Sequence, residues 1–235
     1  MFPISLHGTL ARMGMKALLV AVSDGLPRQD LATHPLGSVD ASRRAAEAVL
    51  PGLVGDQLPD GELAEYCYPY DGIYAGTFGG TALVTSQHDE LLSWVPPGGG
   101  RNAYRVYMQS VVSSASLSYW GADGTFRDFG GSLEDGPFTN IGQPLPFEVP
   151  FWAGQFRDPN IAAEYPGGHM PFHPMDLGEE ALREFFGFVG EGTPRADDLD
   201  AFEIGLHGFE LLNTPRQQKT SAKPGGLFSR LRGRR

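Results

Sequence analysis

The sequence predicts an α+β fold, with a mostly antiparallel β-sheet and helices packed chiefly on one face. Residues 114–120 alternate small polar with apolar side chains, a glycine turn follows at 121–124, and residues 125–129 return, which predicts a β-hairpin. This alternation is typical of an antiparallel sheet with one packed and one wetter face. An apolar stripe at helical spacing over residues 177–189 predicts a helix that packs against the sheet.

The other strands are predicted from apolar runs that end at turn residues. The first run stops at Ser23-Asp24-Gly25, and Gly79-Gly80 separates two further runs as a tight turn would. The predicted strands cover residues 17–22, 73–78, 81–85, 104–112 and 204–212.

Two longer helices are predicted from their spacing and end signals. The first covers residues 40–50 and stops at Pro51-Gly52. The second starts at Asp176, a good N-cap, with Glu179 three residues later in the position of a capping box. Shorter helical turns are expected over residues 61–66 and 87–94.

Prolines interrupt the apolar stretch of residues 141–152. Pro144, Pro146 and Pro150 argue against a central strand or a helix there. We therefore expect an extended segment laid over the core.

The composition indicates one large domain followed by a basic tail. The 235 residues are 41% hydrophobic, enough for a sizeable core, and we expect the side chains between residues 17 and 212 to share one interior. We expect an N-terminal extension over residues 1–12, a single α+β domain over 13–212 and a disordered tail over 213–235. The tail holds seven basic residues and no acidic ones, so the rest carries 18 − 7 = 11 basic against 28 acidic residues.

Charge and cysteine content bear on the class of protein. An acidic body does not suit a phosphate backbone, so we expect no nucleic-acid binding by the main domain. The single cysteine, Cys67, cannot form an internal disulfide or a zinc cluster, and the apolar run 17–22 is too short for a membrane span. We therefore expect a cytoplasmic protein without a transmembrane segment or a cofactor.

Several spaced motifs between about residues 13 and 212 are specific in combination. They are Met13-Gly14-x-Lys16, Asp24-Gly25, Tyr68-Pro69-x-Asp71-Gly72, Ser110-Val111-Val112, Ile141-Gly142-x-Pro144-x-x-Phe147-Glu148, Phe151-Trp152-Ala153-Gly154, Pro171-Phe172-His173-Pro174-x-Asp176-Leu177-Gly178-Glu179, Phe186-Gly187-Phe188 and Leu206-x-Gly208-Phe209. In these motifs the chain resembles a family of uncharacterised actinobacterial proteins. The family has no established activity, so the resemblance implies no function.

One departure from that family bears on chemistry. The resemblance implies a histidine before the Ser110-Val111-Val112 motif and an aspartate after it, but this chain has Gln109 and Ser113. If relatives used such a pair for acid–base chemistry, this chain has lost it. Alternatively, the pair was never catalytic.

The candidate catalytic residues are Asp24, His173 and Glu148. Asp24 follows the first strand, a common place for a site carboxylate, although a turn-forming aspartate explains it equally well. His169 and His173 are four residues apart, as metal ligands on a helix would be, but Pro171 and Pro174 exclude a helix there. A structural role is the simpler interpretation of both histidines.

The candidate binding residues are aromatic or lie beside aromatic residues. Tyr70 and Asp71 belong to a tyrosine-rich segment that could form a stacking wall or simply pack at the rim of the core. Phe151 and Trp152 could form an exposed patch for a partner or cover the core. The cysteine between Tyr66 and Tyr68 has no basic neighbour in sequence, which favours a buried, inert thiol.

The sequence favours a non-enzymatic protein that binds a small ligand or another protein. The reason is that no spacing typical of a catalytic motif surrounds Asp24, His173 or Glu148. The first alternative is a hydrolase-like enzyme that uses these scattered residues as a non-standard acid/base site. The second alternative is an accessory protein at a membrane surface, because residues 226–235 place four arginines beside apolar side chains that could contact an anionic surface.

Overall fold

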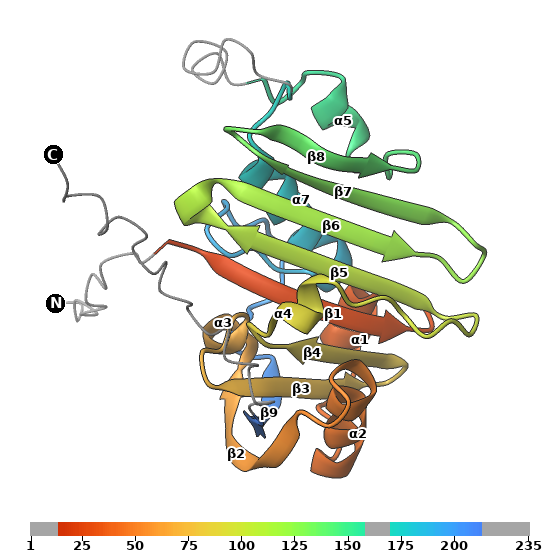
Figure 1. Ribbon diagram of the computed structural model, residues 1–235, viewed down its shortest axis with the longest axis vertical. Coiled ribbons are helices and arrows are strands. Elements are labelled where there is room, and N and C mark those ends of the chain that lie inside the picture. Colours follow the sequence, from red (N-terminus) through yellow and green to blue (C-terminus); the bar gives the residue numbers. More distant parts are fainter. Residues whose placement is uncertain (1–13, 158–169, 213–235) are drawn as a thin grey trace, which may run out of the picture.

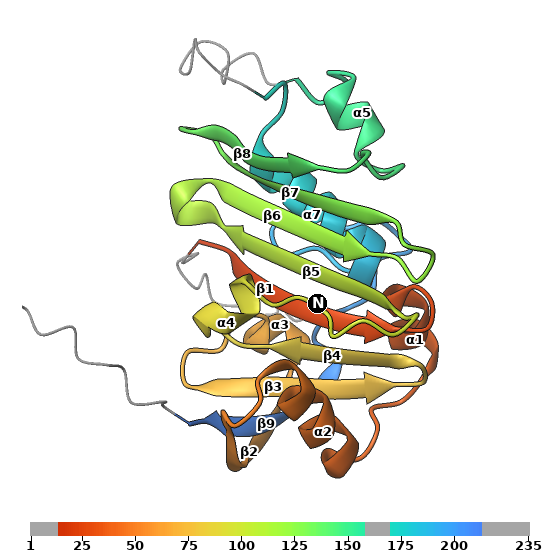
Figure 2. The same cartoon turned by 45° about the vertical axis from the view of Figure 1, so that its right-hand side comes forward.

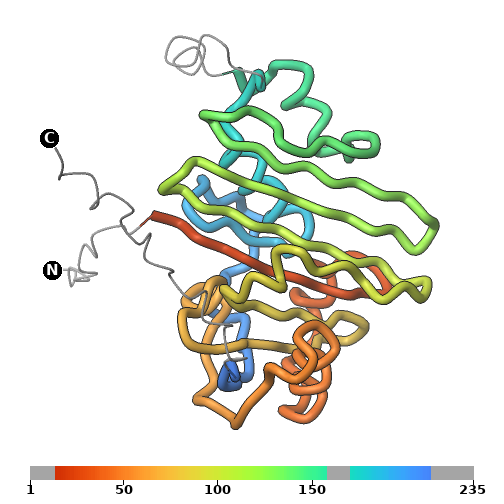
Figure 3. Tube along the Cα trace, viewed as in Figure 1, coloured from red at the N-terminus to blue at the C-terminus, as the bar shows by residue number. Residues whose placement is uncertain are grey.

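A nine-stranded antiparallel sheet organises the part of the chain that the structure describes. The computed structural model describes residues 14–157 and 170–212 (Figures 1 and 3). The strand order across the sheet is β2-β9-β3-β4-β1-β5-β6-β7-β8, and every neighbouring pair is antiparallel. The expected extension over 1–12, the expected tail over 213–235 and His169 lie outside these residues.

The strands confirm most of the sequence prediction. Each predicted strand is present, although β5 ends at Gln109 and a short 3-10 turn, Ser110–Val112, replaces its expected last residues. The bounds are β1 Lys16–Ser23, β2 Val54–Glu62, β3 Gly72–Phe78, β4 Thr81–Thr85, β5 Asn102–Gln109, β6 Ser114–Trp120, β7 Phe126–Ser132, β8 Gly136–Ile141 and β9 Gly205–Leu211.

The sequence did not predict the two strands at the edges of the sheet. β2 and β8 are mostly polar or exposed, and each contains a proline, Pro59 and Pro137. Edge strands tolerate proline because one side of the backbone needs no partner, and they carry a weak apolar signal. The predicted helix over residues 61–66 is accordingly shorter, because β2 continues to Glu62.

The helices also follow the prediction with corrections. α1 was not predicted, and α5 forms a helical turn where prolines had argued against one, since Pro150 stands in its first turn, where no N–H is needed. The bounds are α1 Pro27–Thr33, α2 Val39–Val49, α3 Leu63–Tyr66, α4 Asp89–Leu92, α5 Val149–Trp152 and α7 Pro174–Phe186.

The N-cap of helix α7 is His173, three residues before Asp176, the expected N-cap. The Nδ1 of His173 accepts a hydrogen bond from the backbone N–H of Met175 at 3.1 Å. Glu179 does not complete a capping box. It instead accepts hydrogen bonds from the backbone N–H groups of Gly190 and Glu191, both at 2.8 Å, and so holds the loop that follows the helix.

Helices cover both faces of the sheet, so the expected one-sided arrangement is not confirmed. Alternate residues of β1 point to opposite faces, and they belong to two separate apolar clusters. One cluster contains Leu19 with the buried side of α7, and the other contains Leu18 with the buried side of α2. We expected a single interior, but the sheet separates the apolar side chains into these two clusters. In Figures 1 and 2, α7 lies behind the sheet and α2 lies in front of the sheet.

The connection from β4 to β5, residues 86–101, crosses the sheet as a strap. β4 and β5 both pair with β1, so this segment must pass over β1 to join them. Its buried residues Leu91 and Trp94 belong to the same cluster as α2, which places the strap on the α2 face (Figure 2). The strap over β1 and α2 over β3 and β4 thus lie on the same face of the sheet.

Candidate ligand-binding pocket

The floor of a pocket on the α2 face is a row of directly paired residues on five adjacent strands. The row runs Thr77, Ala82, Val22, Ala103 and Trp120, on β3, β4, β1, β5 and β6. Residues paired in this way lie on one face, so their side chains form a continuous surface. Small side chains at the middle of the row leave space above the sheet, and Trp120 closes one end.

Helix α2 supplies one wall of the pocket with a second small-residue stripe. Ser42, Ala46 and Val49 face the sheet and are buried. The neighbouring stripe lines the pocket with Ala41, Arg44, Ala45 and Ala48, which stand at positions i, i+3, i+4 and i+7. Because alanine side chains are short, they leave space between this side of the helix and the floor of the pocket.

The strap and one hairpin turn complete the pocket, which encloses about 700 Å³. Trp94 stands edge-on to Trp120, with ring centroids 5.9 Å apart, and joins the strap to the floor. Such a pocket lies within the volume range typical of sites for small organic ligands. Besides Trp94, the lining from these segments consists of Val95, Pro96, Pro97, Gly98, Gly99, Gly100, Arg101, Gly121, Ala122 and Gly124.

Arg105 on β5 fastens the strap to the sheet. Its guanidinium donates hydrogen bonds to the carbonyl oxygens of Leu92 and Trp94 and to Ser118 Oγ, the last at 2.7 Å, and it lies 3.6 Å from Asp128. Burial lowers the pKa of Arg105, and the Asp128 carboxylate opposes this shift. The fork of donors fixes the wall of the pocket.

The charged side chains that line this pocket are Arg44 and Arg101. Arg101 lies at the end of the strap, where its Nε donates to Asp24 Oδ1 at 2.6 Å and its Nη2 donates to the carbonyl of Gly80. Arg44 makes no hydrogen bond or ion pair with the described part of the chain. The pocket is therefore apolar inside and cationic at its edge.

The candidate catalytic residues have separate partners. Asp24 is exposed and paired with Arg101, His173 caps α7, and Glu148 is completely buried against Arg127. Each of these three side chains therefore contacts a different partner.

The candidate binding residues also lie apart from the pocket. Tyr70 is 68% exposed, and its carbonyl accepts a hydrogen bond from Gln87. Phe151 is buried and stacks on Phe156 at 4.3 Å between centroids. Trp152 packs edge-on against Phe172, so both aromatic residues cover the core on the α7 face. Asp71, beside Tyr70, is exposed.

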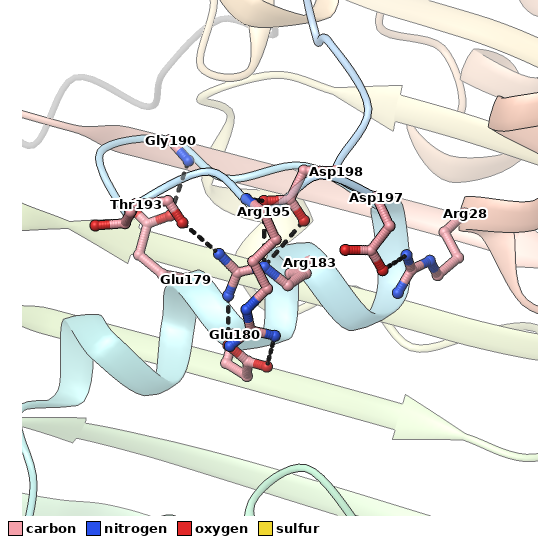
Figure 4. Close-up of polar contacts among 9 residues, drawn as sticks. All are labelled: Arg28, Glu179, Glu180, Arg183, Gly190, Thr193, Arg195, Asp197 and Asp198. Atoms are coloured by element: carbon pink, nitrogen blue, oxygen red, sulfur yellow. Dashed lines mark hydrogen bonds and ion pairs between the residues drawn. The ribbon is translucent and has the colours of Figure 1, made fainter. Parts of the chain in front are cut away.

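A second charged cluster lies between α7 and residues 187–200 (Figure 4). Arg183 donates to Asp198 at 3.0 Å, to the carbonyl of Thr193 at 3.0 Å and to Glu180, which also pairs with Arg195. Each of these groups has a protein partner. We interpret the cluster as a clamp that holds the loop on the helix.

Cys67 lies beside this loop, at the edge of a second pocket of about 550 Å³. Burial raises the pKa of its thiol to about 11, because the charged thiolate would lose its hydration. Its Sγ is 3.3 Å from the carbonyl of Lys16. The structure thus confirms that this thiol is buried, as the sequence interpretation expected.

The described residues contain no group of three His, Cys, Asp or Glu side chains that could hold a metal ion. None of the helices in residues 14–157 and 170–212 is long and apolar enough to cross a membrane.

Sequence reasoning missed the residues that form the pocket. The floor brings together positions from 22 to 120, and no local pattern connects them. The only local signal is on α2, where Ala41, Ala45 and Ala48 continue a helical stripe beyond the width that packing on the sheet requires.

The comparisons with known proteins identify a family whose function is unknown. No curated protein and no solved structure matches the chain. The model of one family, described as a family of unknown function (DUF6928), matches residues 16–209. Because this match spans the whole sheet from β1 into β9, the chain belongs to the DUF6928 family of unknown function.

Proposed function

We propose that this protein binds a small organic molecule in the pocket between α2 and the strap. The observation that carries the proposal is the row Thr77-Ala82-Val22-Ala103-Trp120, which lies under about 700 Å³ of space instead of under a packed helix. A rigid apolar floor with a few polar groups at the edge is the usual design of a ligand site.

The walls support binding rather than catalysis. Among the described residues that line the pocket, the charged side chains are Arg44 and Arg101, and the lining includes no carboxylate, imidazole or thiol that could act as a general acid or base. Glu148, the carboxylate on which a hydrolase mechanism would draw, is occupied by Arg127 and by the backbone N–H of Leu145. The single cysteine supports placing this function in a reducing compartment such as the cytoplasm.

The experiment is a titration with the neutral fluorophore N-phenylnaphthylamine, which brightens in an apolar site. We expect saturable binding to the wild type. The variant Ala45→Phe places a ring in the pocket from α2 and should abolish binding without unfolding the protein.

The matched control is Ala32→Phe. Ala32 is an exposed helical alanine on α1, which packs on the other face of the sheet. Equal probe binding by Ala45→Phe and Ala32→Phe, with both variants folded by circular dichroism, would show that the probe sits elsewhere and would overturn the proposal.

A further inference from the structure

The sign of charge at the pocket edge contrasts with the charge of the chain. The whole sequence carries a formal net charge of −10, yet both charged side chains that line the pocket are arginines. Asp40 and Glu47 stand one turn on either side of Arg44 on α2, but neither lies within ion-pair distance of it. Arg44 therefore keeps its charge available to a ligand.

The glycine segment of the strap adds neutral donors beside Arg101. Gly98, Gly99 and Gly100 all have positive φ, at 79°, 127° and 71°. Their backbone N–H groups donate no hydrogen bond within the described residues, and the space at each of their Cβ positions is open, with no atom within 4 Å. Free N–H groups in such a loop are suited to an anionic oxygen.

Arg101 already holds one carboxylate. Its partner, Asp24, is 71% exposed and meets Arg101 through Nε alone, at 2.6 Å. Pairs of this kind contribute little to stability because water screens them. A ligand anion could therefore displace Asp24 or share the guanidinium with it.

We propose that the pocket selects an amphipathic anion, with an aromatic or alkyl body on the Trp120 end of the floor and a carboxylate or sulfonate at Gly98–Arg101 and Arg44. This inference rests on the proposed function and adds the chemical class of the ligand. Asp24 competes for Arg101 and so limits the affinity for the anion.

A matched pair of probes tests the inference. Anilinonaphthalene sulfonate differs from N-phenylnaphthylamine by one sulfonate group, so the ratio of their dissociation constants reports recognition of the anion. We expect the double variant Arg44→Gln/Arg101→Gln to raise the ratio of the sulfonate dissociation constant to the neutral-probe dissociation constant by about tenfold or more. Asp24→Asn should strengthen sulfonate binding alone.

The control is Arg28→Gln/Arg195→Gln, which also removes two positive charges but from the other face of the sheet. A sulfonate affinity that falls equally in this control and in Arg44→Gln/Arg101→Gln would reflect net charge and would overturn the inference. If the double variant does not fold, Asp24→Asn tests the inference instead. An unchanged ratio of sulfonate-probe affinity to neutral-probe affinity in Asp24→Asn would also overturn the inference. In either case, neutral-probe binding that is lost in Ala45→Phe would leave the pocket function standing.

Discussion

Arg127 and Glu148 form an ion pair in which both side chains are completely buried, with Arg127 Nη2 2.6 Å from Glu148 Oε2. Arg127 Nε also contacts the carboxylate, and its Nη1 donates to Asn140 Oδ1 at 2.6 Å. Glu148 in turn accepts hydrogen bonds from the backbone N–H of Leu145, at 2.9 Å, and from Trp152 Nε1, at 3.3 Å. Through this pair, β7 holds the segment that leads into α5.

The first prediction is that Glu148→Gln destabilises the protein by about 3–5 kcal/mol, because it leaves the Arg127 charge buried without a counter-ion. The free energy of unfolding in urea checks this. The double variant Arg127→Met/Glu148→Gln should recover part of the loss, since it removes the uncompensated charge. As a control, Asp197→Asn breaks the exposed pair with Arg28 and should cost less than about 1 kcal/mol. A cost for Glu148→Gln as small as that of the control would contradict this account.

This ion pair also shows a limit of the sequence analysis. Glu148 is one of the three candidate catalytic residues named from the sequence. Its partner, Arg127, lies 21 residues earlier on strand β7, whereas Glu148 precedes α5, and the fold brings the two together. A buried carboxylate and a catalytic one look alike in sequence, because the distinction depends on what faces the group in space.

The second prediction concerns Ser42 on α2. Its Oγ is buried against the sheet without a hydrogen-bond partner among the described residues. Replacing an unsatisfied buried hydroxyl by a methyl group removes a desolvation cost of about 1–3 kcal/mol, so Ser42→Ala should keep or raise the thermal midpoint. Ser38→Ala is the contrasting variant, because Ser38 caps the same helix and its loss should cost about 1 kcal/mol. A clear loss of stability in Ser42→Ala would point to a hidden partner for the hydroxyl.

The third prediction is a loss of stability at alkaline pH that depends on Cys67. In the folded state the thiol keeps its proton up to a pKa of about 11, whereas in the unfolded chain it ionises near the ordinary value of 9.0. The unfolded state therefore releases a proton first as the pH rises. The contribution of the protonated Cys67 thiol to the free energy of unfolding is fully present below about pH 9. It is lost between pH 9 and 11, by an amount on the order of 3 kcal/mol at most.

Cys67→Ala isolates this contribution. Burial also raises the pKa of Tyr104, so the wild type loses stability at high pH for a second reason with the same sign. The difference between wild type and Cys67→Ala, measured by urea unfolding at pH 8 to 11, removes the tyrosine effect. A difference that does not change with pH would mean that the thiol is as hydrated in the folded protein as in the unfolded one.

The sequence predicted the parts of the fold that depend on neighbouring residues. The hairpin β6–β7 and the helix α7 were found because alternation and helical spacing are local signals. The edge strands β2 and β8 were missed because an edge needs little apolar character. The pocket was missed for a related reason: alanine and valine in strands normally indicate close packing, and only the placement of α2 and the strap leaves space above Val22 and Ala103.

The last prediction links the strap to binding through Arg105. Three protein oxygens, two of them carbonyls of the strap, accept hydrogen bonds from its forked guanidinium, and a lysine amine cannot reproduce that geometry. Arg105→Lys should leave the part-buried carbonyl of Trp94 without a donor and lower the free energy of unfolding by about 1–3 kcal/mol. It should also weaken N-phenylnaphthylamine binding, because the wall formed by Trp94 becomes less rigid. Arg195→Lys is the control, since Arg195 is half-exposed and pairs with Glu180 beside α7 on the other face of the sheet. Thermal melts with and without the probe measure both effects. If Arg105→Lys lost stability but kept full probe affinity, the strap would be an anchor for the sheet alone and would not shape the pocket.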